Sequence, residues 1–516
     1  MLVAIAVTVI AYAALDRGKK GWLGVPILVF LWGLWATLEQ MVAPMAALGL
    51  LAGVGMVVMW ASIGSASDSH IEAVFSLTLL AVAVVSAVIA ICQYFGVSHH
   101  LEPWLSSAPA GEAYGNLRQR NQLASLTSMG FAVVLHRSNL RRLVVWPALI
   151  LLLAANAATA SRIGLAELVL VGVAGAIWRT AYGRPRTWLL LASAAIYIAA
   201  AYALPALLEN VHGIKASNVM DRLVSTSDCA SRRVLWSNVA HLIGMKPWLG
   251  WGWGNLDYAH YVTLYPGARF CDILDNAHNL PMHLAVELGV PTAVICVAAV
   301  LRFVIRRAPW CEQAPARQLA WLLLLAIGAH SMVEYPLWYG PFQMTLGFCI
   351  GLLWRLPSDG LGREARDVFT RPKDHWRRAV AACVSLAVFY VAWDYQRVSQ
   401  AYLPREQRSP FYRDGVLAKI NGSWIFRDQV EFAVITTTPL SIDNAASMAD
   451  AARRLLHFSP EPRVIEVLIE SLWLLDLDDE ALGHMARFKA AFPDAFGRWG
   501  SARMGLSHEM EAPSSR

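Results

Sequence analysis

Long apolar segments separated by short polar connections make up most of the first 395 residues. A helix that crosses a bilayer needs about 20 predominantly apolar residues, and a tilted or interrupted helix can use fewer. On this measure the pattern predicts an all-α polytopic membrane protein with about 12 transmembrane helices. The predicted spans are residues 2–15, 21–38, 43–61, 73–95, 122–135, 143–160, 163–178, 187–207, 280–301, 318–333, 341–356 and 379–395.

The Lys and Arg residues test this alternation, because short cytoplasmic loops hold an excess of both. All basic clusters fall on one side of the predicted membrane. They lie in residues 17–20, 137–142, 179–186, 302–317 and 355–378. Both chain termini and the polar loops 96–121 and 208–279 are then predicted on the opposite, outer face. If the first span is not real, only the N-terminus changes sides.

Residues 396–516 have the mixed polar and apolar pattern of a soluble domain. Apolar residues recur at helical spacing in three segments punctuated by prolines. These segments are residues 443–457, 461–475 and 479–491. We predict a membrane domain of residues 1–395 followed by a soluble domain of antiparallel, tetratricopeptide-like helix pairs on the outer side.

Composition agrees with this organisation. Apolar residues make up 57% of the chain and charged residues 16%, against about 25% charged residues in soluble domains. The net charge of +6 is distributed over short loops rather than along one face. The basic residues are therefore topology signals, and we expect contact with membrane lipid and none with nucleic acid.

A polar, aromatic and glycine-rich segment, residues 248–289, lies between two apolar regions. Irregular polar backbone is tolerated near a bilayer only where it is solvated or lines a site. His278 stands where this segment re-enters the membrane, and a neutral imidazole can take a proton from a hydroxyl nucleophile. The alternative is a histidine that only holds the loop. His283 and Glu287 follow on nearly the same side of one predicted helix.

Five arginines are predicted on the outer face. They are Arg118, Arg120, Arg162, Arg232 and Arg233. Guanidinium groups bind pyrophosphate oxygens through bidentate hydrogen bonds, so several of them together indicate an anionic substrate. The alternatives are a snorkelling interfacial arginine at Arg162 and a solvated charge at either Arg232 or Arg233.

His330 and Glu334 form a second polar patch at the outer end of a span, at i, i+4 spacing. An HxxxE pair also occurs in metal sites, but no third ligand with suitable spacing follows, so we interpret the pair as a structural hydrogen bond that shapes a pocket. We expect no metal and no cofactor. The chain has no GxxxxGK(S/T) loop, and its outer loops have no DxD-like pair, which argues against ATP-driven and nucleotide-sugar mechanisms.

Two of the seven cysteines, Cys229 and Cys271, fall in the large outer loop. In an oxidising compartment such a pair can close the loop, with a nominal stabilisation of about 4 kcal/mol. We predict a disulfide between them. The other five are expected to be apolar fillers or reduced thiols, and they are Cys92, Cys296, Cys311, Cys349 and Cys383.

Five segments occur in an order that resembles the bacterial O-antigen ligase and polymerase superfamily. They are GNLRQRNQLA, TASRIG, RRVLWSNVAHLIGMKPWLGWGWGN, DNAHNLPMHLAVELG and HSMVEYPLWY, all within residues 110–345. The RQRNQ and EYPLWY segments, with the trailing helical domain, look most like the protein-glycosylating branch, the pilin-type O-oligosaccharyltransferases.

The resemblance implies roles for individual residues. His278 matches the essential histidine of the family, Arg162 the arginine of its SR.G segment, and Arg232 the arginine ahead of its tryptophan-bearing loop helix. Arg233 is the one-residue alternative, because the family usually has a single arginine there. We expect other polar residues of these segments to shape the pocket, namely Asn279, Glu287, His330, Glu334 and Tyr335.

The resemblance further implies a metal-independent glycosyltransferase of the bacterial inner membrane whose active site faces the periplasm. The implied donor is an oligosaccharide on a polyprenyl (undecaprenyl) pyrophosphate carrier, and the implied acceptor is a Ser or Thr hydroxyl of a periplasmic protein such as a type IV pilin. An O-antigen ligase or polymerase with a glycan acceptor is the alternative within the enzymes. A lipid or solute transporter is the alternative from another class, although it predicts internal repeats and charges near the midplane, neither of which the sequence has.

Overall fold

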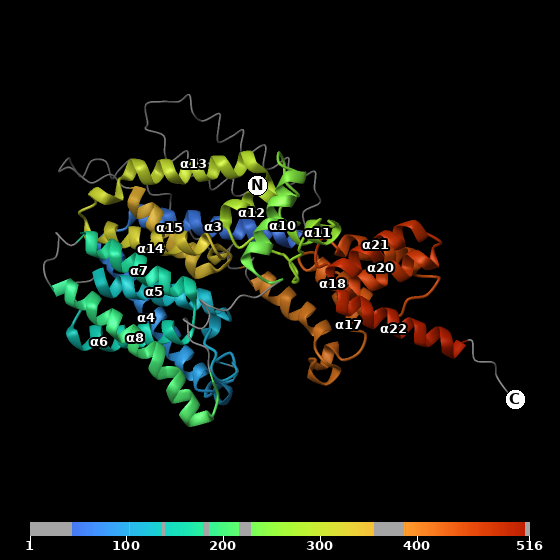
Figure 1. Ribbon diagram of the computed structural model, residues 1–516, viewed down its shortest axis with the longest axis horizontal. Coiled ribbons are helices and arrows are strands. Elements are labelled where there is room, and N and C mark those ends of the chain that lie inside the picture. The colour runs from blue at the N-terminus through green and yellow to red at the C-terminus, as the bar shows by residue number, and fades with distance from the viewer. Residues whose placement is uncertain are drawn as a thin grey trace.

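The regular structure of the described residues is helical throughout (Figure 1). The computed structural model describes residues 44–102, 104–136, 140–178, 185–215, 229–354, 386 and 389–510. The predicted spans 2–15 and 21–38 lie outside these residues, as does much of the predicted span 379–395.

Most of the predicted spans that fall within the described residues coincide with a helix. These helices are α3 (Pro44–Ala66), α4 (Ser69–Tyr94), α5 (Arg120–His136), α6 (Arg142–Ala158), α7 (Arg162–Ile177), α8 (Pro185–His212), α14 (Pro315–Ser331) and α15 (Gly340–Trp354). Within the described part of the chain, two helical stretches are long and apolar enough to cross a membrane, Ser69–Tyr94 and Trp188–His212. The full set of about 12 spans remains a prediction.

One predicted span is two helices rather than one. Residues 280–301 divide into α12 (Leu280–Leu288) and α13 (Val290–Arg307), with Gly289 between them at φ 85°. The loop that precedes α11 lies directly against this junction, because Val290 N–H donates to Pro247 O at 2.8 Å. A Cβ on Gly289 would lie 2.0 Å from Trp248 O, so a glycine is required there. The prediction of one continuous helix was wrong because periodicity does not register this backbone contact.

Helix α5 lies at the centre of the membrane-type core and contacts α4, α6, α7 and α14. Nearly all of its residues are buried, including Leu123, Leu126 and Met129. At the other side of the bundle α3 packs closely on α15, where a Cβ on Gly351 would lie 2.0 Å from Ala61 O. Small residues at such contacts are typical of helix pairs in membranes.

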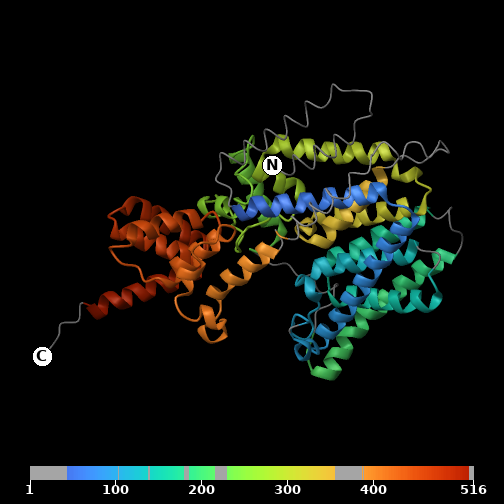
Figure 2. The same cartoon turned by 180° about the vertical axis from the view of Figure 1, so that it is seen from behind.

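The C-terminal helices form a second hydrophobic core. They are α18 (Arg427–Thr437), α19 (Ala445–Leu455), α20 (Pro462–Leu474), α21 (Asp478–Ala491) and α22 (Pro493–Met510), whereas α17 (Val416–Ile420) packs in a separate, smaller cluster. They form a lobe at one end of the long axis, and α10 (Arg232–Met245) and α11 (Leu256–Val262) lie between this lobe and the bundle (Figures 1 and 2). Tyr261 of α11 is buried in the core of the lobe and its hydroxyl is 3.0 Å from His484 Nδ1. The large loop is thus packed against both parts of the molecule.

Candidate active site

The carboxylate of Glu334 joins side chains from three separate segments of the chain. Its Oε1 accepts hydrogen bonds from Arg232 Nη2 and from Asn121 Nδ2, the latter at 3.1 Å. Its Oε2 accepts a hydrogen bond from His278 Nδ1 at 2.9 Å. Glu334 therefore holds a guanidinium and an imidazole side by side, one on each of its oxygens.

Glu334 is ionised in this arrangement. It lies beyond the end of α14, and its side chain is 4% exposed. Burial raises the pKa of the carboxyl, but the hydrogen bond from His278 and the positive charge of Arg232 act in the opposite direction, and the pKa lies below its ordinary value of 4.5. The charge is tolerated at this depth because hydrogen-bond donors satisfy both oxygens.

The tautomer of His278 follows from its contact with Glu334. A carboxylate only accepts, so Nδ1 carries the proton and Nε2 is left as an acceptor for a substrate proton. His278 has a left-handed backbone with φ 49°, and its N–H donates to Asn276 Oδ1 at 2.8 Å. Such a conformation is uncommon outside glycine and persists where surrounding contacts hold it. The ring is therefore fixed in orientation, yet its side chain remains 18% exposed.

Three helices begin near this site with a side-chain cap. Ser161 caps α7, Ser231 caps α10 and Asn279 caps α12, each by accepting a hydrogen bond from a backbone N–H in the first turn. Ser161 also donates to Asn121 Oδ1 at 2.7 Å, and Asn121 in turn donates to Glu334. The caps and Asn121 together bring helix starts from distant parts of the chain to one carboxylate.

Arginines occupy the first position of three helices near this site. Arg120, Arg162 and Arg232 begin α5, α7 and α10 respectively. A helix N-terminus carries a partial positive charge, so an arginine there gains nothing from its own helix dipole. Positive side chains and helix N-termini together would stabilise an anionic ligand.

The neighbours Arg232 and Arg233 differ in their contacts. Arg232 is bonded to Glu334 while its side chain stays 39% exposed, so some of its N–H groups remain available. Arg233 is exposed, and among the described residues it has no hydrogen bond or ion pair. Arg162 is likewise exposed, with no such partner in the described part of the chain. Of the predicted pair, it is Arg232 that reaches the Glu334 network.

Arg118 and Arg120 lie at the entrance to α5. Arg120 Nη2 is 3.8 Å from Glu112 Oε1, and Arg118 is exposed with φ 57° at the end of the short helix η3 (Gly115–Leu117). Within the described residues neither arginine contacts Glu334. Their neighbour Asn121 does, and the sequence analysis did not single it out, although it lies inside the RQRNQ segment.

His330 and Glu334 do not pair through their side chains. They share a backbone hydrogen bond, from Glu334 N–H to His330 O at 2.9 Å. The His330 ring instead contacts Ser125 Oγ and lies 3.4 Å from Glu167 Oε1. Ser125, Glu167 and His330 are fully buried between α5, α7 and α14. The predicted HxxxE patch is therefore divided between a buried cluster and the Glu334 site.

His283 and Glu287 pair along one face of α12. His283 Nε2 is 3.3 Å from Glu287 Oε2, with both side chains almost completely buried. The His283 ring meets Trp253 and Trp338 edge to face, at centroid distances of 5.6 and 5.1 Å. Through Trp253, this pair packs α12 against the glycine-rich loop. His278 lies just before the start of the same helix.

The two segments that deliver Arg232 and His278 are covalently linked. Cys229 and Cys271 form a disulfide with Cα atoms 5.4 Å apart. Cys229 precedes α10 and Cys271 precedes the turn that carries His278. A bond at this point limits how far the arginine and the histidine can separate.

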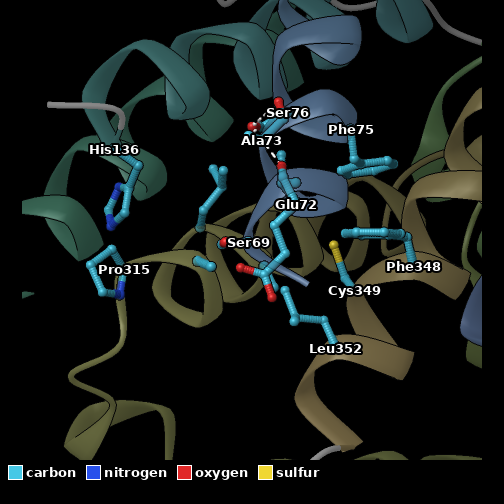
Figure 3. Close-up of a pocket in the computed structure, with 14 residues that line it drawn as sticks. Ser69, Glu72, Ala73, Phe75, Ser76, His136, Pro315, Phe348, Cys349 and Leu352 are labelled. Carbon is cyan, nitrogen blue, oxygen red and sulfur yellow. Dashed lines mark hydrogen bonds between the residues drawn. The ribbon is translucent and has the colours of Figure 1, made fainter. Parts of the chain in front are cut away.

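A pocket lies at the opposite ends of the same helices (Figure 3). It is lined by His136 at the end of α5, by Pro315 at the start of α14 and by Glu72 of α4. The rings of Phe75 and Phe348 stack beside it with centroids 3.8 Å apart. Because the Glu334 network uses the first turn of α5 and the chain beyond α14, this pocket is separate from the candidate active site. Among the described residues no group of three or more His, Cys, Asp or Glu side chains is placed to hold a metal ion.

Comparison with protein families identifies three regions of the chain. Residues 147–297 match the family model described as O-antigen ligase, and residues 113–135 match the model described as protein glycosylation ligase. Residues 318–504 match the C-terminal model of the virulence factor membrane-bound polymerases. These matches and two curated relatives support the likeness of the chain to the O-antigen ligase and protein glycosylation ligase superfamily. The resemblance seen in the sequence is thereby confirmed.

Two relatives in this superfamily come from Acinetobacter baylyi. The general O-oligosaccharyltransferase is 24% identical over 316 residues, which cover 58% of this chain and 54% of the relative. The ComP-specific O-oligosaccharyltransferase is 24% identical over 260 residues, covering 48% of this chain and 45% of the relative. The chain thus spans about half the length of the curated relatives it matches.

Proposed function

We propose that this protein is a protein O-oligosaccharyltransferase. It moves a glycan from a polyprenyl-pyrophosphate carrier to a Ser or Thr hydroxyl of a periplasmic protein, and a type IV pilin is one such acceptor. The observation that carries the proposal is the bridge of Glu334 between Arg232 and His278, because it sets a phosphate-binding group beside a proton acceptor. The names of the two relatives support the same class of reaction.

In the proposed step, the acceptor hydroxyl oxygen attacks C1 of the donor sugar. The bond from that oxygen to C1 forms as the bond from C1 to the pyrophosphate oxygen breaks. The hydroxyl proton passes to His278 Nε2, the nitrogen that Glu334 does not occupy. Glu334 then stabilises the imidazolium that results, as a carboxylate does in other histidine-based catalytic groups.

The departing pyrophosphate carries away the electron pair and gains negative charge. Arg232 is the first candidate to stabilise that charge, because it is fixed by Glu334 and still partly exposed. Arg162 and Arg120 begin neighbouring helices and would add positive charge around the lipid phosphate. We expect Arg118 and Arg233 to contribute less, since both lie exposed and away from the carboxylate network.

The proposal includes the predicted membrane arrangement. About 12 spans would place the Glu334 site at the periplasmic face of the inner membrane. The C-terminal lobe, predicted to be a tetratricopeptide-like domain, would then lie in the periplasm beside α11. A disulfide between Cys229 and Cys271 is compatible with that compartment.

A glycan acceptor is the second candidate. The match of residues 147–297 to the O-antigen ligase model favours it, because transfer to a sugar hydroxyl would use the same donor and the same base. The two activities differ only in which hydroxyl reaches His278.

The test reconstitutes the full chain in lipid nanodiscs with an undecaprenyl-pyrophosphate-linked oligosaccharide. A pilin and a lipid A core oligosaccharide are offered in separate reactions, and the product masses are measured. A pilin mass increase equal to one glycan is expected. Transfer to the core sugar alone would establish the second candidate, and transfer to neither acceptor would refute the proposed reaction.

A further inference from the structure

Three aromatic rings line one side of His278 and are here called the aromatic shelf: Tyr335, Trp338 and Tyr339. The Tyr335 ring meets the His278 imidazole edge to face with centroids 5.0 Å apart. Tyr335 also stacks on Tyr339 and meets Trp338 at an edge, both at 6.3 Å. The shelf thus extends from the proposed base toward the outside of the molecule.

One face of the aromatic shelf packs against the protein, and the other face is exposed. Trp253, which is buried, stacks on Trp338 with centroids 5.9 Å apart and an interplanar angle of 17°. Trp338 nevertheless remains 43% exposed. A small recess beside it is lined by Asn276, Leu280, Tyr335 and the short helix η6 (Pro336–Trp338), among others. A large ring held rigid from one side and exposed on the other is suited to pack against a ligand.

An exposed carboxylate lies next to the shelf. Asp275 precedes Asn276 in the turn that carries His278, and it is exposed. Among the described residues it is in no ion pair, and its carboxylate accepts hydrogen bonds from the backbone N–H groups of Asp275 and Asn276. Glu334 and Glu287, in contrast, are both buried against histidines. Asp275 directly precedes Asn276, which lines the same recess as Tyr335 and Trp338, so the carboxylate lies beside the shelf. Burial and the negative charge of Asp275 together raise the pKa of Tyr335 to about 12.

Charge separates the two sides of His278. Arg232, on one oxygen of Glu334, favours an anion, whereas Asp275 repels one. A phosphate would therefore avoid the shelf. A sugar ring fits it, because the apolar C–H face of a sugar packs on an aromatic ring while its hydroxyls donate to a carboxylate.

Aromatic side chains also act as anchors at membrane interfaces. An anchor, however, needs only lipid contact, and it gains nothing from an exposed carboxylate beside the rings. The combination of Asp275 with the shelf is what favours a polar ligand that has an apolar face.

We propose that Asp275 and the aromatic shelf form the subsite for the sugar that is transferred, the one attached to the carrier pyrophosphate. This inference rests on the proposed function and deepens it. The donor would lie with its pyrophosphate toward Arg232 and its first sugar on Trp338, which places C1 between the arginine and His278. Asp275 would accept hydrogen bonds from the sugar hydroxyls and would fix which face of C1 the acceptor meets.

The test measures equilibrium binding of two lipids to the full chain in nanodiscs. One lipid is a polyprenyl pyrophosphate that carries a disaccharide, and the other is the same polyprenyl pyrophosphate without sugar. The variants are Asp275→Asn and Trp338→Leu. The matched control is Asp272→Asn, because Asp272 is an exposed acid in the same loop, close to Asp275 in sequence.

We expect Asp275→Asn to weaken binding of the sugar-bearing lipid about tenfold. Trp338→Leu should weaken it by about three- to tenfold. Trp338→Leu should bind the sugar-free lipid as the wild type does, and Asp275→Asn should bind it at least as tightly, because the variant removes a negative charge that repels pyrophosphate. Asp272→Asn should bind both lipids unchanged. An equal loss for both lipids, or no loss for either, would overturn the sugar subsite.

A third readout separates this inference from the proposed function. If Asp275→Asn raises the apparent KM for the acceptor protein and leaves binding of the sugar-bearing lipid unchanged, the surface holds the acceptor and the sugar subsite is wrong. If the wild type binds neither lipid, the proposed donor itself is wrong and the subsite fails with it.

Discussion

Two histidine–glutamate pairs lie close together in this protein, and they differ in what surrounds them. His278 and Glu334 come from distant segments, are 2.9 Å apart and share their carboxylate with Arg232. His283 and Glu287 lie one turn apart on α12, are 3.3 Å apart and are enclosed by tryptophan rings. The first pair therefore adjoins a cation and is partly exposed, whereas the second pair has no adjoining cation among the described residues and is buried.

The difference shows how environment assigns a role to a histidine. Charge separation in a closed apolar site is costly, so the His283 pair is suited to hold α12 in place and not to cycle protons. The first pair is supported by Arg232 and by Asn121, and its histidine keeps one nitrogen accessible. Chemistry is therefore expected at His278 although its residue type and its partner are the same as at His283.

The largest expected effect comes from removing the two histidines separately. His278→Ala should lower the transfer rate by about 100- to 10,000-fold, the usual contribution of a general base. His283→Gln should retain most activity per folded molecule and lower the thermal midpoint, because it disturbs a buried pair. Initial rates of glycan transfer and thermal unfolding of the purified proteins check both. Equal rates for the two variants would remove the distinction between the pairs.

The two glutamates give the next test. Glu334→Gln should lower the rate by about 100-fold or more, because an amide does not hold the Nδ1–H tautomer of His278 or stabilise its imidazolium. Glu287→Gln, of the same size and burial, should change the rate less than the stability. The pH profile of the rate separates the two roles, because a purely structural residue does not alter it. The profile should change in Glu334→Gln and stay like that of the wild type in Glu287→Gln.

Arg232 and Arg233 offer a matched pair of charges. Arg232→Ala should lower the rate by about 100- to 1,000-fold through loss of phosphate stabilisation. Arg233→Ala should change it by less than about threefold, as expected for an exposed side chain without a partner. A rate measurement for each variant at saturating donor decides the matter. A stronger effect at Arg233 would assign the phosphate to the neighbouring arginine.

The disulfide tests whether the active pair depends on linking its two segments. Opening it by Cys229→Ser with Cys271→Ser should lower the rate several-fold and reduce stability by up to about 4 kcal/mol. The His283 pair, which lies within one helix, should be unaffected. Mass mapping without reductant gives the state of the two thiols in the wild type, and free thiols in an active protein would contradict the link.

The smallest expected effect is on acid stability. Because the pKa of Glu334 is below its ordinary value of 4.5, the stabilisation from its pairing is fully present above about pH 4.5 and is lost as the pH falls through the lowered value. The thermal midpoint of the wild type should therefore exceed that of Glu334→Gln near neutral pH. The two should converge in acid, and a constant difference down to low pH would refute the charged pairing.

Much of the helical layout was predictable from the sequence. Apolar runs located α4, α5 and α14, since a helix buried in lipid or protein requires such runs. The break at Gly289 was not predictable, because it depends on contact with Trp248 O. The starts of two helices were recognisable from the sequence, because Ser161 and Ser231 are typical N-cap residues. They stand directly before the arginines that begin α7 and α10.

The polar segment that ends at Gly289 was the first candidate for chemistry on sequence grounds, and His278 was named there. Residue types and their order were enough for that, because a polar histidine next to apolar spans needs a reason to be there. The choice between Arg232 and Arg233, and the contact of Glu334 with His278 rather than with His330, came only from the tertiary structure. Both depend on which side chains meet across more than fifty residues of chain, and local spacing carries no information about such contacts.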